Sequence, residues 1–357
     1  LGALSTDLSV MQGLQVALRK GKWQATVAVH NDETIIALWP GVMEDVYGLA
    51  VDVGSTTIAA HLIHLKTGKV AASAGLMNPQ IRYGEDLMSR VSYSMMNEGG
   101  ADTMRDAIWD ALNGLLQAAC NEADVPAEQV LDIVLVGNPV MHHLFLGIDP
   151  VELGGAPFAL ATDEGMSMKA SEIKIMAHPG ARLYVLPCIA GHVGADAAAV
   201  GLAERPDQQD ELTFIVDVGT NAEMFLGNKD RVLAASSPTG PAFEGAQISA
   251  GQRAAAGAIE RVRIDPETLE PRFRVIGSEL WSDEEGFAES VASSGITGIC
   301  GSGIIEAIAE MYLAGVIDED GVVQGGLAEK SPRIVSDDRT FSFELKGGDN
   351  PIHVTQN

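Results

Sequence analysis

The stretch ELTFIVDVGTNAEMFLGNKDRVLAASS, residues 211–237, repeats the plan of YGLAVDVGSTTIAAHLIHLKTGKVAASA, residues 47–74. Each copy has an apolar run, Asp-Val-Gly, small polar residues, a second strand-like run, a basic turn and a third run that ends in Ala-Ala-Ser. The two copies are much farther apart than the ~20–50 residues of a solenoid repeat. The duplication therefore predicts an α/β fold with two similar lobes, residues 47–205 and 206–357, that face each other across a cleft.

The remaining pattern between and after the two copies alternates strands with helices. Apolar residues at helical spacing predict a helix over 102–120, and a continuous apolar run predicts a strand over 131–136. Asn138-Pro139 is typical of a helix start. We expect a short strand over 183–187, an alanine-rich helix over 193–203 and a helix from the glycine-rich stretch at 298–303 to near Gly315.

Residues 1–46 have a different pattern, with a weak helical stretch at 8–18 and a hairpin over 23–38 closed by Pro40-Gly41. This segment is too small to form a core alone, and we interpret it as the C-terminal part of a preceding middle or linker domain. The chain also stops where we expect further helical sequence in the second lobe, which predicts truncation at the C-terminus.

The composition excludes several classes of protein. The chain has 357 residues, 46% of them hydrophobic, which is too apolar for a disordered protein. Its net charge of −26 argues against nucleic acid or an anionic membrane as partner. It has no apolar run of about 20 residues, and we do not expect its first residues to be a signal peptide, because they have no basic start and no sustained apolar run. Its cysteines, Cys120, Cys188 and Cys300, support neither a disulfide framework nor a metal motif. These features predict a soluble, cytoplasmic protein.

The Asp-Val-Gly turns have a chemical use. Gly54 lets a ligand approach the backbone, so that successive N–H groups and the hydroxyls of Ser55, Thr56 and Thr57 can hold phosphate oxygens. Asp52 is suited to Mg²⁺, through water. The second copy offers Asp217 as its carboxylate and Gly219, Thr220 and Asn221 as its phosphate-binding residues. The alternative is two unrelated tight turns in which the aspartates act as caps, and the matching strand contexts favour the first interpretation.

Two further stretches complete the predicted site. Gly301, Ser302 and Gly303 start a helix, and bare backbone at a helix N-terminus suits an anion or a flat adenosine ring. Glu244, between glycines, is a candidate to orient the attacking water, with an ordinary exposed carboxylate as the alternative. We expect Cys300 to be a small buried side chain rather than a reactive thiol.

Other polar residues have weaker signals. A dense polar run after the first copy is a candidate surface for a partner protein or for the cleft: Asn78, Gln80, Arg82, Tyr83 and Asp86. His142 and His143 are adjacent, so a shared metal face is unfavourable and simple packing is expected. His192 and Asp196 are four residues apart and are interpreted as a pair on one helix, at the cleft or merely stabilising that helix.

Longer stretches carry a family resemblance. The twin turns and the late glycine-rich loop resemble the superfamily of acetate and sugar kinases, heat-shock ATPases and actin. Six stretches resemble the reductive activators of corrinoid enzymes: NPQIRYGEDLMSRV (78–91), LVGNPVMHHLFLGIDP (135–150), LPCIAGHVGADAAA (186–199), FIVDVGTNAEM (214–224), SPTGPAFEGAQIS (237–249) and CGSGIIEAI (300–308). The resemblance implies two actin-like, ribonuclease H-like lobes that bind ATP or ADP with Mg²⁺. It also implies that the whole protein reduces corrinoid Co(II) to Co(I) at the expense of ATP, for a methyltransferase system.

The same resemblance implies a 2Fe–2S ferredoxin-like domain, for which this chain has no four-cysteine motif. We expect that cluster only in a missing N-terminal part, so this chain would be the ATP-binding and partner-docking part. Three alternatives stay open: a small-molecule kinase, an activator of another low-potential enzyme such as a 2-hydroxyacyl-CoA dehydratase, and a scaffold that binds ATP without hydrolysing it. The expected partner is a corrinoid protein, and a homodimer is an open alternative.

Overall fold

A computed structural model describes residues 4–219, 221–239, 248–348 and 350–356. The chain separates into two compact units. Unit 1 comprises Leu1–Asp217 and Glu223–Ser236, and unit 2 comprises Val218–Ala222 and Ser237–Asn357. The domain limits at residues 46 and 205 stay a prediction, because this grouping is made on contacts and divides the chain within the second repeat.

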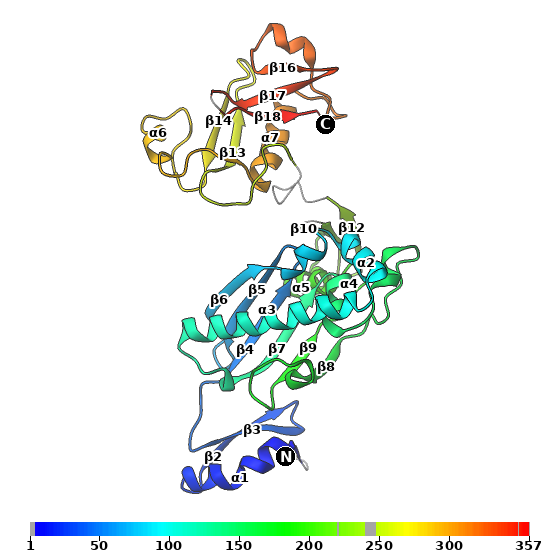
Figure 1. The fold of residues 1–357 in the computed structure, drawn as a ribbon, viewed down its shortest axis with the longest axis vertical. Helices are drawn as coiled ribbons and strands as arrows, with labels where there is room; N and C mark the ends of the chain where they lie inside the picture. The colour runs from blue at the N-terminus through cyan, green and yellow to red at the C-terminus, as the bar shows by residue number, and fades with distance from the viewer. Residues whose placement is uncertain (1–3, 220, 240–247, 349, 357) are drawn as a thin grey trace. The chain divides into compact units, whose positions relative to one another are not determined.

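The N-terminal part of unit 1 is a helix packed on a small sheet (Figure 1). Strands β2 (Ala25–His30) and β3 (Thr34–Pro40) form the antiparallel hairpin that the sequence predicts, and β1 (Ser5–Thr6) pairs with β3 in parallel. Helix α1 covers Leu8–Lys20. Asp7 joins this part to the main sheet, since its carboxylate accepts hydrogen bonds from Arg182 at 2.9 Å and Lys169 at 3.1 Å.

The centre of unit 1 is a six-stranded sheet in the order β6-β5-β4-β7-β9-β8. The first repeat forms the antiparallel strands β4, β5 and β6, while β4, β7 and β9 run parallel to one another. Their bounds are β4 (Tyr47–Val53), β5 (Thr57–His64), β6 (Lys69–Met77), β7 (Val130–Gly137), β8 (Met166–Lys169) and β9 (Arg182–Val185). Each sequence-predicted strand of this region is therefore present.

Helices cover this sheet and bury its apolar side chains in one core (Figure 1). Helix α3 (Gly100–Ala123) was expected over 102–120, and it buries a stripe at helical spacing that includes Met104, Ile108, Leu112 and Leu115. Helix α4 (Pro139–Leu146) begins where expected, because the Asn138 side chain accepts a hydrogen bond from the Met141 N–H. Helix α2 covers Leu87–Met96 and α5 covers Ala195–Glu204.

The second repeat forms a separate three-stranded sheet, β10 (Thr213–Val218), β11 (Asn221–Asn228) and β12 (Arg231–Pro238). Phe225 of β11 is buried with Val193 and with Ala197 of α5. This packing holds the second repeat against the amino end of α5.

Unit 2 has its own core around helix α7 (Gly301–Leu313). One sheet has the order β14-β13-β15, and the other has the order β16-β17-β18. The remaining bounds are β13 (Ala258–Ile264), β14 (Pro271–Val275), α6 (Phe287–Ser290), β15 (Gly298–Ile299), β16 (Ile334–Asp337), β17 (Thr340–Lys346) and β18 (Ile352–Thr355). No helix in the described ranges is both long and apolar enough to cross a membrane.

Candidate functional site

The first Asp-Val-Gly turn lies between β4 and β5, at the carboxyl end of β4. A side chain on Gly54 would place its Cβ 2.6 Å from the Thr57 carbonyl oxygen, so the tight turn requires glycine. The Asn78 side chain donates to the Gly54 carbonyl at 2.8 Å, and its backbone N–H donates to the Thr56 carbonyl at 2.8 Å. Buried polar groups therefore fix the path of this turn from inside the protein.

Another asparagine side chain also contacts this turn. Asn138, the N-cap of α4, donates from Nδ2 to the Ser55 hydroxyl at 3.2 Å. Ser55 is buried, whereas Thr57 is exposed. Of the phosphate-binding residues predicted in the first copy, Ser55 is therefore buried and bonded to Asn138, whereas Thr57 faces solvent.

Four carboxylates gather near this turn, and two of them are the aspartates that the sequence singles out. Asp52 and Asp217 are the next-to-last residues of β4 and β10. Asp196, the second residue of α5, and Glu223 of β11 join them. The interactions between their charges show the proximity: Asp52 interacts with Asp217, and Asp196 interacts with the other three.

The local backbone explains how α5 brings Asp196 to the end of the sheet. A Cβ on Gly194 would lie 2.6 Å from the Asn138 Cα and 2.7 Å from the Gly137 carbonyl oxygen. The start of α5 therefore packs directly against the junction of β7 and α4, which only glycine permits. Carboxyl ends of parallel strands are the usual ligand side of such a sheet.

Burial and mutual repulsion raise the pKa values of three members of the cluster. Burial raises the pKa of Asp196 to about 7, and the charges of Glu223, Asp52 and Asp217 act in the same direction. Burial and then Asp217 raise the pKa of Asp52, although its side chain still reaches solvent. Burial also raises the pKa of Glu223, which accepts a hydrogen bond from the Ser236 hydroxyl at 3.1 Å. A bound divalent cation would favour the ionised forms.

The donor set fits Mg²⁺ held partly through water. Mg²⁺ prefers oxygen ligands and usually takes only one or two carboxylates, with water and phosphate completing its shell. Within the described ranges, no three His, Cys, Asp or Glu side chains are arranged to bind a metal together. Asp52 and Asp217 are therefore suited to hold a hydrated ion rather than to enclose a bare one.

Sequence reasoning missed two members of the cluster. The sequence gives no signal for Glu223, and it predicts a helix pair of Asp196 with His192. That pairing is wrong, because α5 begins at Ala195 and the His192 ring packs at a tilt against Phe158, with a centroid distance of 4.3 Å. The Asp196 side chain instead accepts from the Ala197 N–H at 2.8 Å. A single carboxylate among small apolar residues in VGADAAAV was the available signal.

The polar run after β6 has a mixed placement. Asn78 and Gln80 are fully buried, so they hold the turn and α3 from inside and offer no surface to a partner. Asp86 is the N-cap of α2, accepting from the Ser89 N–H at 2.7 Å. Arg82 is exposed and its guanidinium lies 4.7 Å from the centre of the Tyr83 ring. Arg82 and Tyr83 are thus the members that remain candidates for partner contact.

In unit 2, the predicted adenosine loop is the start of α7. A Cβ on Gly303 would lie 2.2 Å from the Ile259 carbonyl oxygen, so this glycine is needed for packing of α7 on β13. Gly301 is buried and Ser302 is exposed. Cys300 is buried, as expected, and its thiol donates to the Ile259 carbonyl at 3.2 Å. An adenosine site here stays a prediction.

Several remaining predictions can be placed. Gly219 and Asn221 bracket the second turn, where the Gly219 N–H donates to the Asn221 carbonyl at 2.8 Å. Thr220 and Glu244 lie outside the described residues. His142 and His143 are packed in the core of unit 1, as expected.

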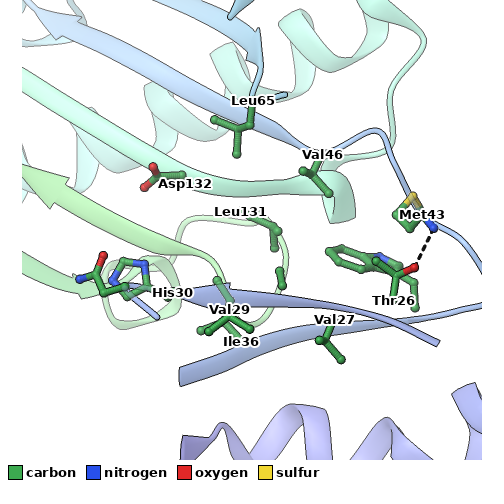
Figure 2. Close-up of a pocket in the computed structure, with 13 residues that line it drawn as sticks. Thr26, Val27, Val29, His30, Ile36, Met43, Val46, Leu65, Leu131 and Asp132 are labelled. Carbon is green, nitrogen blue, oxygen red and sulfur yellow. Dashed lines mark hydrogen bonds between the residues drawn. The ribbon is translucent and has the colours of Figure 1, made fainter. Parts of the chain in front are cut away.

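A pocket of about 400 Å³ lies between the β2–β3 hairpin and the amino end of β7 (Figure 2). Figure 2 shows mainly aliphatic side chains, among them Val29, Ile36 and Leu131, with His30 and Asp132 at one end. Burial raises the pKa of Asp132, and His30 acts in the opposite direction. No residue that the sequence predicts for the nucleotide site lines this pocket.

Comparison with known protein families accounts for almost the whole chain in three consecutive stretches. Residues 1–45 match the RACo linker region, and residues 47–209 match the RACo middle region. Residues 211–357 match the C-terminal domain of RACo, the ASKHA domain.

Individual relatives agree with these matches. The corrinoid activation enzyme RamQ of Eubacterium limosum is 30% identical over 321 residues, covering 87% of this chain and 51% of the relative. The Co(II) methylated amine-specific corrinoid protein reductase of Methanosarcina barkeri is 28% identical, covering 81% of this chain and 53% of the relative.

A solved structure of a reductive activator for corrinoid, iron–sulfur protein is 32% identical. It superimposes with a TM-score of 0.80, covering 99% of this chain and 55% of that one. The chain spans about half the length of these relatives. The resemblance stated from the sequence motifs is confirmed: the chain belongs to the RACo family of reductive activators of corrinoid proteins, and it comprises linker, middle and ASKHA regions.

Proposed function

We propose that this chain is the ATP-binding and ATP-hydrolysing part of a reductive activator, which returns corrinoid cobalt from Co(II) to Co(I) for a methyltransferase system. Family membership and the names of its relatives support the reaction class. The observation that carries the nucleotide part is the carboxylate cluster beside the first glycine turn. Its raised pKa values indicate a site suited to a cation that accompanies polyphosphate.

Within this proposal, each part of the cluster has a defined task. When bound, Mg²⁺ supplies charge neutralisation at the phosphates. Asp52 and Asp217 orient its water ligands, and the turn that begins at Gly54 positions the phosphate. Catalysis is then positioning and electrostatic stabilisation rather than covalent chemistry. With a net charge of −26, the protein does not depend on a broad basic surface to attract the nucleotide.

The remaining ligand contacts are proposed from the sequence. Gly219, Thr220 and Asn221 serve the phosphates from the second repeat, Gly301, Ser302 and Gly303 serve the adenosine, and Glu244 orients water. Arg82 and Tyr83 are the proposed contact with the corrinoid protein.

The electron reaches cobalt from a donor other than the cysteines of this chain. A four-cysteine 2Fe–2S site needs more thiols than the three present, and Cys120, Cys188 and Cys300 are all buried. Buried thiols also disfavour the alternative of an activator whose cluster is bridged between subunits. Reduction of one Co(II) takes up one electron from that donor, and hydrolysis of ATP to ADP and phosphate supplies the free energy.

A reconstituted reduction assay tests this function. The chain is mixed anaerobically with a Co(II) corrinoid protein, a low-potential chemical reductant and Mg²⁺, and the Co(I) absorption band is followed with and without ATP. We expect ATP to be required for the Co(I) band and to be hydrolysed, and Asp217→Asn to abolish both effects. Formation of a phosphorylated small molecule in place of free phosphate would contradict the proposal and favour the kinase alternative.

A further inference from the structure

A buried arginine lies directly behind the first glycine turn. Arg90 of α2 is fully buried. Its Nη2 donates to the Ser55 carbonyl, its Nε donates to the Gly84 carbonyl at 2.9 Å, and its Nη1 donates to Gln80 Oε1 at 3.3 Å. Nη1 also contacts the Met141 sulfur at 3.2 Å. All three nitrogens of the guanidinium are therefore hydrogen-bonded, and Nη2 is the one that binds the turn.

Together with Asn78, the arginine binds three successive carbonyl groups of the turn. Asn78 binds the carbonyls of Gly54 and Thr56, and Arg90 binds the carbonyl of Ser55 between them. Three successive carbonyl oxygens of the turn therefore point to buried donors. A turn whose carbonyls are fixed on the inner side is preorganised for a ligand on the outer side.

Each of these Arg90 contacts is with a neutral acceptor, which is unusual for a buried charge. Its acceptors are two backbone carbonyls, an amide oxygen and a thioether. Burial lowers the pKa of Arg90 to about 10, and the negative charge of Asp86 acts in the opposite direction, so the group remains charged at neutral pH. A buried cation without a bonded carboxylate is costly unless a counter-charge is nearby.

We propose that Arg90 is a positioning residue for polyphosphate: it fixes the turn at Ser55 and supplies the buried positive charge that favours an anion bound on the other side of that turn. This inference rests on the proposed nucleotide function and adds to it the source of the positive charge. The carboxylate cluster binds the cation that accompanies the phosphates, and Arg90 balances the phosphates themselves.

A charge-neutralising substitution separates this role from simple structural support. Gln80→Glu places a carboxylate on the Arg90 Nη1 at nearly constant side-chain size, and it loses the hydrogen bond from Gln80 Nε2 to the Met104 carbonyl, which the thermal unfolding of the variant monitors. Arg90→Met removes the charge but keeps an extended apolar side chain, and Arg90→Lys keeps the charge but loses the fork of donors. Arg105→Met is the matched control, because Arg105 is an arginine of α3 already paired with Asp102 and Asp106.

The measurement is the dissociation constant of Mg·ATP, inorganic triphosphate and adenosine for the full chain, by calorimetry, with thermal unfolding recorded for each variant. We expect Gln80→Glu and Arg90→Met to weaken ATP and triphosphate by about tenfold or more, because a charge in a low-dielectric site acts strongly on a nearby anion. Arg90→Lys, adenosine binding and the Arg105 control should change much less.

The proposal is overturned if Gln80→Glu leaves triphosphate binding unchanged, if Arg90→Lys is as defective as Arg90→Met, or if adenosine weakens as much as ATP. If Arg90→Met does not fold, Gln80→Glu and Arg90→Lys decide the question. A wild-type chain that binds triphosphate but not ATP would contradict the nucleotide function. The triphosphate affinities of the same variants would still test the role of Arg90. A wild-type chain that binds neither would overturn both.

Discussion

The two Asp-Val-Gly turns have the same sequence plan but are held in different ways. The first is fixed from outside the hairpin, by Asn78 and Arg90, and a Cβ on Gly54 would collide with backbone at 2.6 Å. Within the described residues, the second is held by the Gly219 N–H, which donates to the Asn221 carbonyl, and by the Thr239 hydroxyl, which donates to the Gly219 carbonyl; a Cβ on Gly219 would make only an ordinary 3.5 Å contact there. The two copies thus share a chain path, but the first turn is bonded to a buried helix residue, Arg90, and is packed more tightly than the second.

The strand before the first turn is also more buried than the strand before the second turn. β4 lies inside the six-stranded sheet between β5 and β7, and most of its residues are buried or half-buried. β10 is the edge of a three-stranded sheet, and its residues alternate between half-buried and exposed. A strand buried on both faces gives its terminal turn a firm base, whereas a strand with one open face depends more on local hydrogen bonds.

The largest expected effect concerns the carboxylates that both turns contribute. Asp52→Asn and Asp217→Asn are each expected to lower the rate of ATP hydrolysis on the order of 10²–10³-fold, the range for removing one preorganised electrostatic group. Steady-state phosphate release measures this rate. Asp230→Asn, in the exposed turn at the far end of the second hairpin, is the control and should be neutral. A loss confined to one aspartate would show that the turns do not act as a pair.

The second prediction uses Asp196, which interacts with the carboxylates of both turns. Its pKa in the folded protein is raised to about 7, above an unfolded value near 3.9. The folded state therefore holds a proton that the unfolded state has lost, so this group's contribution to stability is complete below pH ~4 and disappears as the pH rises to about 7. Without Mg²⁺, the free energy of unfolding of the wild type should fall relative to Asp196→Asn across that range.

Urea unfolding of both proteins at several pH values measures this difference. Asp265→Asn is the control: hydrogen bonds from Thr268 and Glu267 lower the pKa of Asp265, so its contribution changes only below pH ~4 and should stay nearly constant across this range. A constant difference between wild type and Asp196→Asn from pH 4 to 7 would show that the pKa of Asp196 is not raised in the folded protein.

Much of this contrast lies beyond what the sequence can predict. The repeat correctly predicts strand, turn and strand in both copies, because apolar runs and glycine turns are local signals. It does not reveal Arg90 or Asp196, since each acts through contacts with distant parts of the chain. Asn78 and Gln80 illustrate the limit, because polar residues in a polar run indicate a surface until tertiary packing buries them.

The third prediction tests rigidity through the two glycines. Gly54→Ala should destabilise the protein by about 1–3 kcal/mol, the usual cost of overpacking. Gly219→Ala should change stability by no more than about 0.5 kcal/mol, as expected where no clash arises. Thermal or urea unfolding measures both. Gly114→Ala in α3, where a Cβ meets nothing within 4 Å, should be neutral or stabilising. Equal losses at Gly54 and Gly219 would remove the distinction between the turns.

The smallest expected effect lies in the second turn, where the Thr239 hydroxyl donates to the Gly219 carbonyl at 2.6 Å. Thr239→Val removes this donor at nearly constant volume and should cost about 1 kcal/mol, the typical net value of one hydrogen bond. Thr239→Ser keeps the donor and should recover most of that loss. Because a Cβ on Gly219 would find room in the second turn, we expect Thr239→Val to weaken ATP binding less than Arg90→Met does. If Thr239→Val weakened ATP binding as strongly as Arg90→Met, the second turn would depend on Thr239 as much as the first depends on Arg90.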